Sequence, residues 1–239
     1  MENKARIQKV LSDQGILSRR RTEELIKEGR ITVNGRPAQP GHPIDIRRDI
    51  VAIDGERVWF QKKKKNYYVM LHKPRGYVTT MSDEKGRRSV ADLVADFPVR
   101  LYPVGRLDMD SEGLLLLTND GDLTNRLLHP AGEIHKTYQV WLSGASEGKI
   151  AAMSRPMDID GYRIRPAQVE LVKLQGDQAQ VNVTIHEGRN RQIRKMAEKC
   201  GMTVMRLRRI SEGGLQLGKL PPGKWRYLTE NEVAMLKSL

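Results

Sequence analysis

A run of four leucines, residues 114–117, is the most apolar stretch of the chain and constrains its fold most strongly. Gly113 precedes the run, and the turn-forming sequence Asn-Asp-Gly follows it at residues 119–121. Four residues are too few for a helix, and turn residues close both ends, so the pattern predicts a strand buried on both faces. A loop that runs into such a strand is held in place by the core.

The loop that enters this strand reads R-L-D-M-D-S-E and carries one arginine and three acidic residues. Asp108 lies two residues after Arg106, on the same side of an extended chain, and a nearby guanidinium keeps a carboxylate ionised. An ionised, well-positioned aspartate can act as a nucleophile. We interpret Asp110 and Glu112 as surface carboxylates, the usual fate of these residue types.

A calcium site is the alternative interpretation of this loop, because D-M-D-S-E-G resembles the start of an EF-hand loop with Gly113 at its sixth position. The twelfth position, which requires a bidentate glutamate, is Asn119, and leucines occupy positions that should be solvated. The single cysteine, Cys200, and the five histidines show no metal-ligand spacing. We therefore expect no metal and no disulfide framework.

The charge balance indicates a polyanionic partner. The chain has 239 residues, with 42 Lys and Arg against 29 Asp and Glu, a formal net charge of +13. A soluble protein this basic usually binds nucleic acid. Aromatic residues make up only 5% of the chain, so contacts to phosphates and RNA shape should outweigh widespread base stacking. The N-terminus is polar and no apolar run approaches the ~20 residues of a membrane span, so we expect a cytoplasmic protein.

The first quarter of the chain predicts a small module of two short helices and a β-hairpin. Apolar residues recur at helical spacing in both helical segments, glycines end them, and Ser18 is a natural N-cap for the second. Asn34-Gly35 predicts a two-residue hairpin turn. The residues expected to point inward are Ile7, Val10, Leu11, Leu25 and Ile26.

Three consecutive arginines, residues 19–21, open the second helix, where the helix dipole disfavours cations. A solvated charged face is the simpler interpretation, but phosphate binding uses both the free N–H groups and the guanidiniums. The pattern R-I-Q-K-V-L, then S-R-R, then G-R-I-x-V-N-G resembles the S4 RNA-binding domain. We expect RNA contacts from Lys9, Arg19, Arg20 and Arg30.

We expect three parts: an S4-like α/β RNA-binding domain over residues 1–61, a basic linker over 62–66, and a catalytic domain over 67–239. Residues 1–65 contain 16 basic and 9 acidic residues, a denser positive charge than in the remainder. The lysine run at 62–65 is expected to be exposed and to reach RNA.

The larger part predicts alternating strands and helices. Strands are expected at residues 68–71, 101–104, 138–142, 179–185 and 204–210. Helices are expected at 89–97, at 122–128, within 187–200 with Ile193, Met196 and Ala197 inward, and in a C-terminal segment with a capping box from Thr229 to Glu232. Residues 143–175 indicate only a short helix and polar hairpins.

The catalytic loop carries a family resemblance. G-R-L-D followed by S-x-G-L-L-L-L-T-N-D-G resembles the signature loop of the RNA pseudouridine synthases, in the branch typified by RsuA, RluB and RluF. The resemblance implies an α+β fold with a mixed, largely antiparallel sheet flanked by helices. It also implies that Asp108 is the catalytic aspartate, acting on a uridine of ribosomal RNA. No phosphate-binding loop or dinucleotide fingerprint is present, so we expect no cofactor.

Three further segments resemble motifs of the same family: H-K-P-R-G at 72–76, K-T-Y at 136–138 and G-R-N-R-Q-I-R at 188–194. The resemblance implies that Tyr138 lies against the target base and that Arg194 pairs with Asp108. It implies that Arg106 fills the space left by the flipped base. We also expect RNA contacts from Lys73, Arg189 and Arg191.

Resemblance to this branch implies ribosomal RNA as the substrate, and we expect 23S RNA, free or in a pre-ribosomal particle. We expect the protein to be a monomer. Two alternatives stay open: a 16S RNA enzyme of the same family, and a non-catalytic ribosomal-RNA-binding or ribosome-assembly protein. A glycosidase that uses two carboxylates is a further alternative, but the sequence offers no convincing acidic residue to act together with Asp108.

Overall fold

The structure is a computed structural model that describes residues 4–61, 65–129, 132 and 134–239. The chain separates into two compact units, Met1–Asn66 with Pro98–Arg100, and Tyr67–Phe97 with Leu101–Leu239. Most of the predicted basic linker, residues 62–64, lies outside the described residues. No helix in the described ranges is long and apolar enough to cross a membrane.

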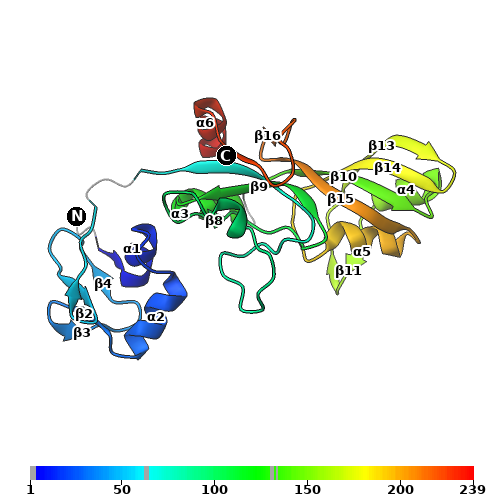
Figure 1. The fold of residues 1–239 in the computed structure, drawn as a ribbon. Helices are drawn as coiled ribbons and strands as arrows, with labels where there is room; N and C mark the ends of the chain where they lie inside the picture. The colour runs from blue at the N-terminus through cyan, green and yellow to red at the C-terminus, as the bar shows by residue number, and fades with distance from the viewer. Residues whose placement is uncertain (1–3, 62–64, 130–131, 133) are drawn as a thin grey trace. The chain divides into compact units, whose positions relative to one another are not determined.

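The first unit contains two helices and short strands (Figure 1). Its helices are α1 (Ile7–Asp13) and α2 (Arg19–Lys27), and its strands are β1 (Ala5–Arg6), β2 (Ile31–Val33), β3 (Arg36–Pro37), β4 (Pro43–Ile44), β5 (Val51–Ile53) and β6 (Glu56–Arg57). Strands β3, β2, β5 and β6 form one sheet in that order, and β1 pairs with β4. All five residues predicted to point inward are buried in one apolar cluster.

Two local predictions in this unit are confirmed. The Ser18 hydroxyl accepts a hydrogen bond of 3.0 Å from the Arg21 amide and so caps α2. Asn34 and Gly35 both have positive φ, 52° and 78°, as a type I′ hairpin turn between β2 and β3 requires.

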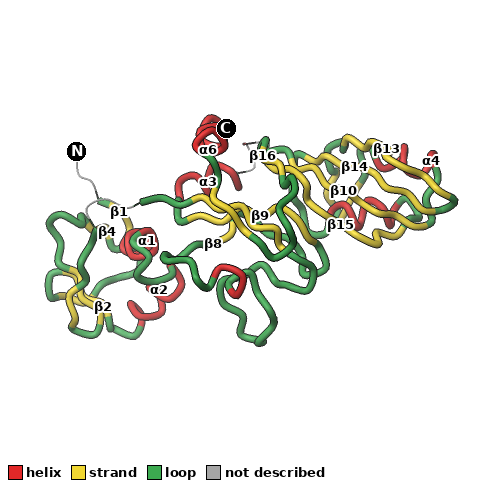
Figure 2. The backbone as a smooth tube through the Cα atoms, turned by 45° about the horizontal axis from the view of Figure 1, so that its top comes forward, coloured by secondary structure: helices red, strands yellow, loops and turns green. Residues whose placement is uncertain are grey.

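The second unit is built on a nine-stranded sheet. Its main path runs β13 (Gln168–Gln175), β14 (Gln178–Ile185), β10 (Lys136–Ser143), β15 (Thr203–Glu212), β9 (Glu112–Thr118), β7 (Tyr68–Lys73) and β17 (Trp225–Tyr227), with β8 (Tyr102–Pro103) on β9 and β16 (Leu215–Gln216) on β15. Figure 2 shows β13, β14, β10 and β15 side by side. The β15–β9 ladder is parallel and the others are antiparallel, which confirms the mixed, largely antiparallel sheet.

Helices and one separate hairpin complete this unit. The helices are η1 (Asp92–Val94), α3 (Gly121–Leu128), α4 (Glu147–Met153), α5 (Gln192–Lys199) and α6 (Glu230–Ser238), and the hairpin pairs β11 (Asp158–Ile159) with β12 (Tyr162–Arg163). The capping box of α6 is formed as predicted, by Thr229 and Glu232. The helix predicted at 89–97 is instead a single 3₁₀ turn, η1, because Asp92 accepts a hydrogen bond from the Ser89 amide and closes the segment locally.

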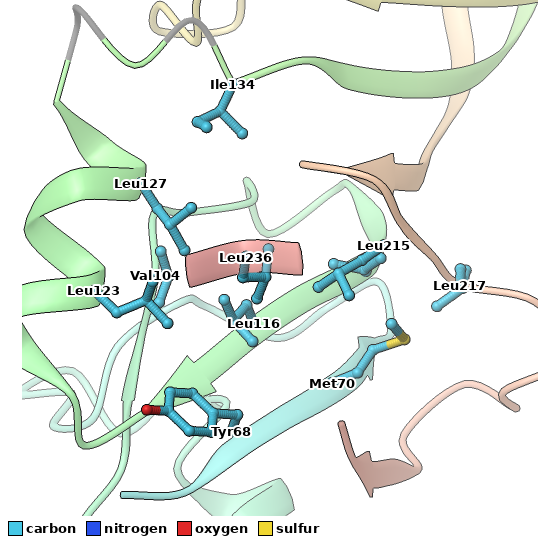
Figure 3. Close-up of a cluster of buried hydrophobic side chains, with 11 residues drawn as sticks. Tyr68, Met70, Val104, Leu116, Leu123, Leu127, Ile134, Leu215, Leu217 and Leu236 are labelled. Atoms are coloured by element: carbon cyan, nitrogen blue, oxygen red, sulfur yellow. The ribbon is translucent and has the colours of Figure 1, made fainter. Parts of the chain in front are cut away.

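Strand β9 is buried along its whole length, as the leucine run predicts. It lies between β15 and β7, so both edges are also paired. Leu114 and Leu116 pack in a cluster with Leu123 and Leu127 of α3 and Leu236 of α6 (Figure 3). The loop that carries Asp108 therefore ends on a strand that is buried and paired on both edges.

Gly113 does not precede the strand, as the sequence suggested, but lies inside it. Its φ is +114°, and a Cβ added there would lie 2.2 Å from the carbonyl oxygen of Arg209. Glycine is required because the backbones of β9 and β15 approach too closely for a side chain. This contact joins the end of the Asp108 loop directly to β15.

Candidate active site

The loop that carries Asp108 is fixed by hydrogen bonds to its backbone. The Thr79 hydroxyl donates to the Leu107 carbonyl at 2.6 Å and accepts from the Leu107 amide at 3.2 Å. The Gly76 amide donates to the Met109 carbonyl at 2.7 Å, and the Ser111 amide closes a turn onto the Asp108 carbonyl at 3.1 Å. The Asp108 side chain, 35% exposed, is thus presented from a backbone that has little freedom to move.

The Lys73 side chain stabilises the same loop through hydrogen bonds to backbone carbonyls. Its side chain is fully buried, and its Nζ donates to the carbonyl oxygens of Ser111 at 2.8 Å and Pro74 at 3.0 Å. Burial lowers the pKa of the Lys73 amine to about 8, against the opposing effect of the nearby carboxylates. The predicted RNA contact of Lys73 is contradicted, because a side chain without exposed surface cannot reach a phosphate.

Two arginines of the α5 region meet the acidic residues of the loop. The Arg191 guanidinium lies 3.3 Å from the Asp108 carboxylate and 3.2 Å from that of Asp110. Arg194 lies 3.2 Å from the Asp110 carboxylate, and it also donates to the Asp110 carbonyl at 3.2 Å and the Ser111 hydroxyl at 3.3 Å. Asp110 is therefore shared between both arginines.

This arrangement corrects the predicted partner of Asp108. The ion pair on Asp108 is made by Arg191, not by Arg194 or Arg106, while Arg194 holds the backbone of the loop one turn farther along the helix. Arg191 reaches Asp108 because it occupies the N-cap position of α5 with a left-handed backbone, φ +51°. Such a conformation is rare for residues other than glycine and persists where surrounding contacts impose it.

The interpretation as surface carboxylates is wrong for Glu112, which is buried, whereas the Asp110 side chain is 39% exposed but is paired with two arginines. Partial burial raises the pKa of Asp110, but the Arg191 and Arg194 guanidiniums outweigh this effect and hold that pKa below its usual range. Glu112 is 6% exposed and pairs with Arg206 of β15. Both acidic residues link the loop to neighbouring elements, a role that requires partners distant in sequence and so is not visible in a local pattern.

Asp108 opens onto a cavity of about 440 Å³. Its volume is within the range of roughly 300–1,000 Å³ that holds small ligands. Its lining is partly apolar and includes six cationic residues: Arg106, Lys136, Arg165, Arg189, Arg191 and Arg209. Two acidic side chains, Asp108 and Glu187, also line the cavity, so the charged residues of the lining are mainly cationic and suit a single nucleotide with its phosphates. Among the described residues, no group of three or more His, Cys, Asp or Glu side chains gathers as metal ligands would.

Tyr138, on β10, lines this cavity together with Asp108. The ring is 8% exposed, and burial raises the pKa of its phenol above the usual value. Arg209 of β15 lies 3.5 Å from the phenol oxygen, donates to the Leu114 carbonyl at 2.7 Å and pairs with Glu212 at 3.2 Å. The structure thus brings Tyr138 to the same cavity as Asp108. The fully buried guanidinium of Arg209 adjoins the Tyr138 hydroxyl.

Sequence reasoning did not assign a role to Arg209. The residue alternates with Leu207 along β15, and both are buried. An arginine on an otherwise apolar strand face is a signal for a buried site, because an arginine is rarely buried without a partner.

The remaining predicted residues have different surroundings. Arg106 lines the cavity and, within the described ranges, forms no hydrogen bond or ion pair, so its guanidinium is available to a ligand. Arg189 also lines the cavity. In the first unit, Arg19 and Arg20 are exposed at the start of α2, whereas Lys9 pairs with Asp13 at 2.8 Å and Arg30 pairs with Asp54 at 2.7 Å.

Comparison with protein families gives two matches. The model described as RNA pseudouridylate synthase matches residues 67–199, and the S4 domain model matches residues 5–51. The first match contains the Asp108 loop, Tyr138 and α5; the second contains α1, α2 and the β2–β3 hairpin.

Comparison with individual proteins agrees with these families. A protein of Aquifex aeolicus named "Uncharacterized RNA pseudouridine synthase" is 40% identical over 97% of this chain and 93% of its own. The Bacillus subtilis protein named "Ribosomal large subunit pseudouridine synthase B" is 39% identical over 98% of this chain and 96% of its own. A solved structure titled "Crystal structure of pseudouridylate synthase" has a TM-score of 0.69 and 29% identity, covering 97% of this chain and 99% of that one.

Proposed function

The chain belongs to the RNA pseudouridylate synthase family, and from that premise we propose that it converts one uridine of 23S ribosomal RNA to pseudouridine. The observation that carries the proposal is that Asp108 and Tyr138 line one cavity together with several cationic side chains, on a chain similar over its full length to a protein named as a large-subunit RNA enzyme. The substrate RNA, free or in a pre-ribosomal particle, would be met in the cytoplasm.

Isomerisation of uridine breaks the bond between N1 of the base and C1′ of the ribose and forms a bond from C5 of the base to the same carbon. The proton on C5 is then lost and N1 gains one, so the reaction needs neither an oxidant nor an energy source. In our proposal Asp108 acts at the ribose as the nucleophile, and Arg191, 3.3 Å away, holds its carboxylate in position.

The uracil must leave its stack to reach Asp108, which costs a few kcal/mol. Arg106, whose guanidinium has no partner among the described residues, would occupy the space left in the RNA. Tyr138 would lie against the flipped base and take part in the transfer of the C5 proton. Arg209 supports this role because a buried guanidinium at 3.5 Å favours partial negative charge on the phenol oxygen.

The S4-like unit would hold the RNA independently of the chemistry. Three arginines at residues 19–21 are exposed at the start of α2, where free backbone N–H groups also favour phosphate. Contacts of this kind are sequence-independent and weaken with salt. We expect affinity to depend mainly on this surface and selectivity mainly on the cavity.

Mapping pseudouridines in 23S and 16S RNA from a strain that lacks the gene tests the proposal. One uridine of 23S RNA should be unmodified in the deletion strain, and it should be restored by the wild-type gene but not by Asp108→Asn. If the deletion strain instead lacks a pseudouridine in 16S RNA, the substrate is small-subunit RNA. An unchanged modification pattern would instead support a non-catalytic ribosome-assembly protein.

A further inference from the structure

Tyr162 is an exposed aromatic ring at the edge of the catalytic cavity. Its side chain is 41% exposed, and it lines the cavity together with Asp108. Two other aromatic residues in the described ranges are exposed, Trp59 and Tyr227. Tyr227 packs against the rings of Phe97 and Trp225, and neither Tyr227 nor Trp59 lines the cavity. Tyr162 therefore lacks the packing that explains Tyr227 and stands where RNA would enter.

The ring is carried by a hairpin that is firmly held. Tyr162 pairs with Ile159 across the hairpin, and Ile159 and Ile164 are buried at 2% and 1% exposure. The turn residues Asp160 and Gly161 have φ of 51° and 75°, as a tight two-residue turn requires. An exposed ring on a fixed support loses little entropy when a ligand binds.

The hairpin is also tied to the catalytic helix. Lys195 of α5 donates to the Asp160 carboxylate at the hairpin turn. Figure 1 shows β11 of this hairpin beside α5. Because α5 begins at Arg191, which pairs with Asp108, the helix that orients the catalytic carboxylate also positions the hairpin.

Arg189 places a planar guanidinium over the Tyr162 ring. Its guanidinium carbon lies 3.1 Å from the centroid of Tyr162, so the two groups are stacked, and its side chain is itself 41% exposed. The only acidic partner of Arg189 among the described residues is Glu187, at 3.4 Å. Stacked aromatic and guanidinium planes are surfaces on which proteins hold unpaired RNA bases.

We propose that Tyr162 and Arg189 form a stacking site for an unpaired nucleobase next to the target uridine, and that this site contributes to the choice of that uridine. The inference rests on the proposed function. The target ribose lies at Asp108, so the neighbouring nucleotide must lie along the rim of the same cavity. Because few aromatic side chains are available elsewhere on this protein, removal of one stacking ring should be measurable.

A purely structural role for the pair is the alternative. In that case Tyr162 would only pin the hairpin to the segment before α5, and its loss would lower stability without regard to RNA sequence. A double-mutant cycle separates the two roles: the ring is removed from the protein, the base is removed from the RNA, and the two losses of binding affinity are compared with the loss when both are removed. Tyr162→Phe keeps the ring, Tyr162→Ala removes it, and Leu171→Ala is a matched control with the same 41% exposure outside the cavity.

The experiment first uses wild-type protein to identify the converted uridine in 23S RNA. A synthetic stem-loop with that uridine is then made intact and with single abasic nucleotides at each neighbouring loop position. Binding is measured by fluorescence anisotropy at fixed salt with full-length protein carrying Asp108→Asn, which prevents turnover. The melting temperature of each variant checks that it is folded.

We expect Tyr162→Ala to weaken binding of the intact stem-loop about tenfold, within the range for base–aromatic stacking, whereas Tyr162→Phe and Leu171→Ala bind like the parent. With the RNA that is abasic at one particular loop position, the parent protein should bind about tenfold more weakly than with the intact RNA. Tyr162→Ala should bind this abasic RNA as well as it binds the intact RNA. Additive losses at every position, or no loss in Tyr162→Ala, would overturn the inference alone. If the wild type converts no uridine, the proposed function fails and the inference fails with it.

Discussion

Arg191 contacts Asp108 at 3.3 Å from a left-handed backbone with φ +51°. A conformation of this kind costs about 1–3 kcal/mol in a residue other than glycine. The protein retains it at the first residue of the α5 region that contacts the Asp108 loop. We attribute the strained N-cap to the need to bring a guanidinium to the Asp108 carboxylate.

Arg191→Ala should reduce turnover of the RNA about 10- to 100-fold, because Asp108 loses its ion-pair partner. Lys199→Ala, an exposed cation in the last turn of the same helix, is the control and should have no such effect. Single-turnover assays at saturating protein separate this loss from weaker binding. Turnover of Arg191→Ala equal to that of the control would contradict the assigned role.

Arg191→Gly should be more stable than Arg191→Ala by about 1 kcal/mol, although both lose the charge. Glycine adopts a positive φ without strain, whereas alanine does not. Urea unfolding of the two variants measures the difference. Equal stabilities would show that the backbone at this position is not strained in solution.

Arg194→Ala should destabilise the unit by about 2–3 kcal/mol, more than Arg191→Ala. The Arg194 side chain is 14% exposed and holds both the carboxylate and the carbonyl of Asp110, so its loss leaves polar groups without partners. Arg194→Lys keeps the charge but not the planar fork and should be intermediate. Urea unfolding that ranks the alanine variants in the reverse order would contradict this division of roles.

The site shows which relationships a sequence reveals. Asp108 and Tyr138 were identified because their motifs are local and resemble a family, and the structure brings them to one cavity. The identity of the arginine beside Asp108 depends on where α5 begins and on a backbone conformation that arginine rarely adopts. The family resemblance implied Arg194 as the partner, and nothing in the residue pattern indicated the left-handed conformation that brings Arg191 to Asp108 instead.

Gly113→Ala should cost the protein several kcal/mol, because the new Cβ would lie 2.2 Å from a backbone oxygen of β15. Gly176→Ala is a matched control: its φ is also positive, at +59°, but nothing lies within 4 Å of the added atom. The control should lose only about 1 kcal/mol. Chemical denaturation distinguishes a clash from backbone strain, and similar losses in both variants would argue against the close contact of β9 and β15.

The buried Lys73 amine predicts a pH dependence of stability. Its pKa is about 8 in the folded protein, against an ordinary value of 10.5. Between these values the unfolded chain binds more protons than the folded one, so the free energy of unfolding rises with pH. Below pH 8 the amine is charged in both states and the folded state bears the full cost of burying it.

Lys73→Met should remove this dependence. Between pH 8 and pH 10.5 the stability of the wild type should increase relative to that of the variant, by on the order of 3 kcal/mol at most. Lys85→Met, an exposed lysine in the same unit, should leave the wild-type profile unchanged. Parallel pH profiles of wild type and Lys73→Met would show that the amine is not desolvated.

Much of the fold follows from periodicity, and the exceptions have a common cause. The β9 strand, the inward residues of α5 and the alternation along β14 were predictable because each buries one repeating apolar face. The β11–β12 hairpin was expected only as one of the polar hairpins within residues 143–175, without bounds, since its two-residue strands are too short to show a period. Strand β17 was missed, because its partner β7 lies more than 150 residues earlier in the chain.

The most direct test of the account is the activity of Asp108→Asn on 23S RNA from a strain that lacks the gene. Asparagine preserves the size of the side chain but is a poor nucleophile, so RNA binding should equal that of the wild type while no pseudouridine forms. Pseudouridine formation by Asp108→Asn at a rate near that of the wild type would contradict the central claim that this carboxylate performs the chemistry.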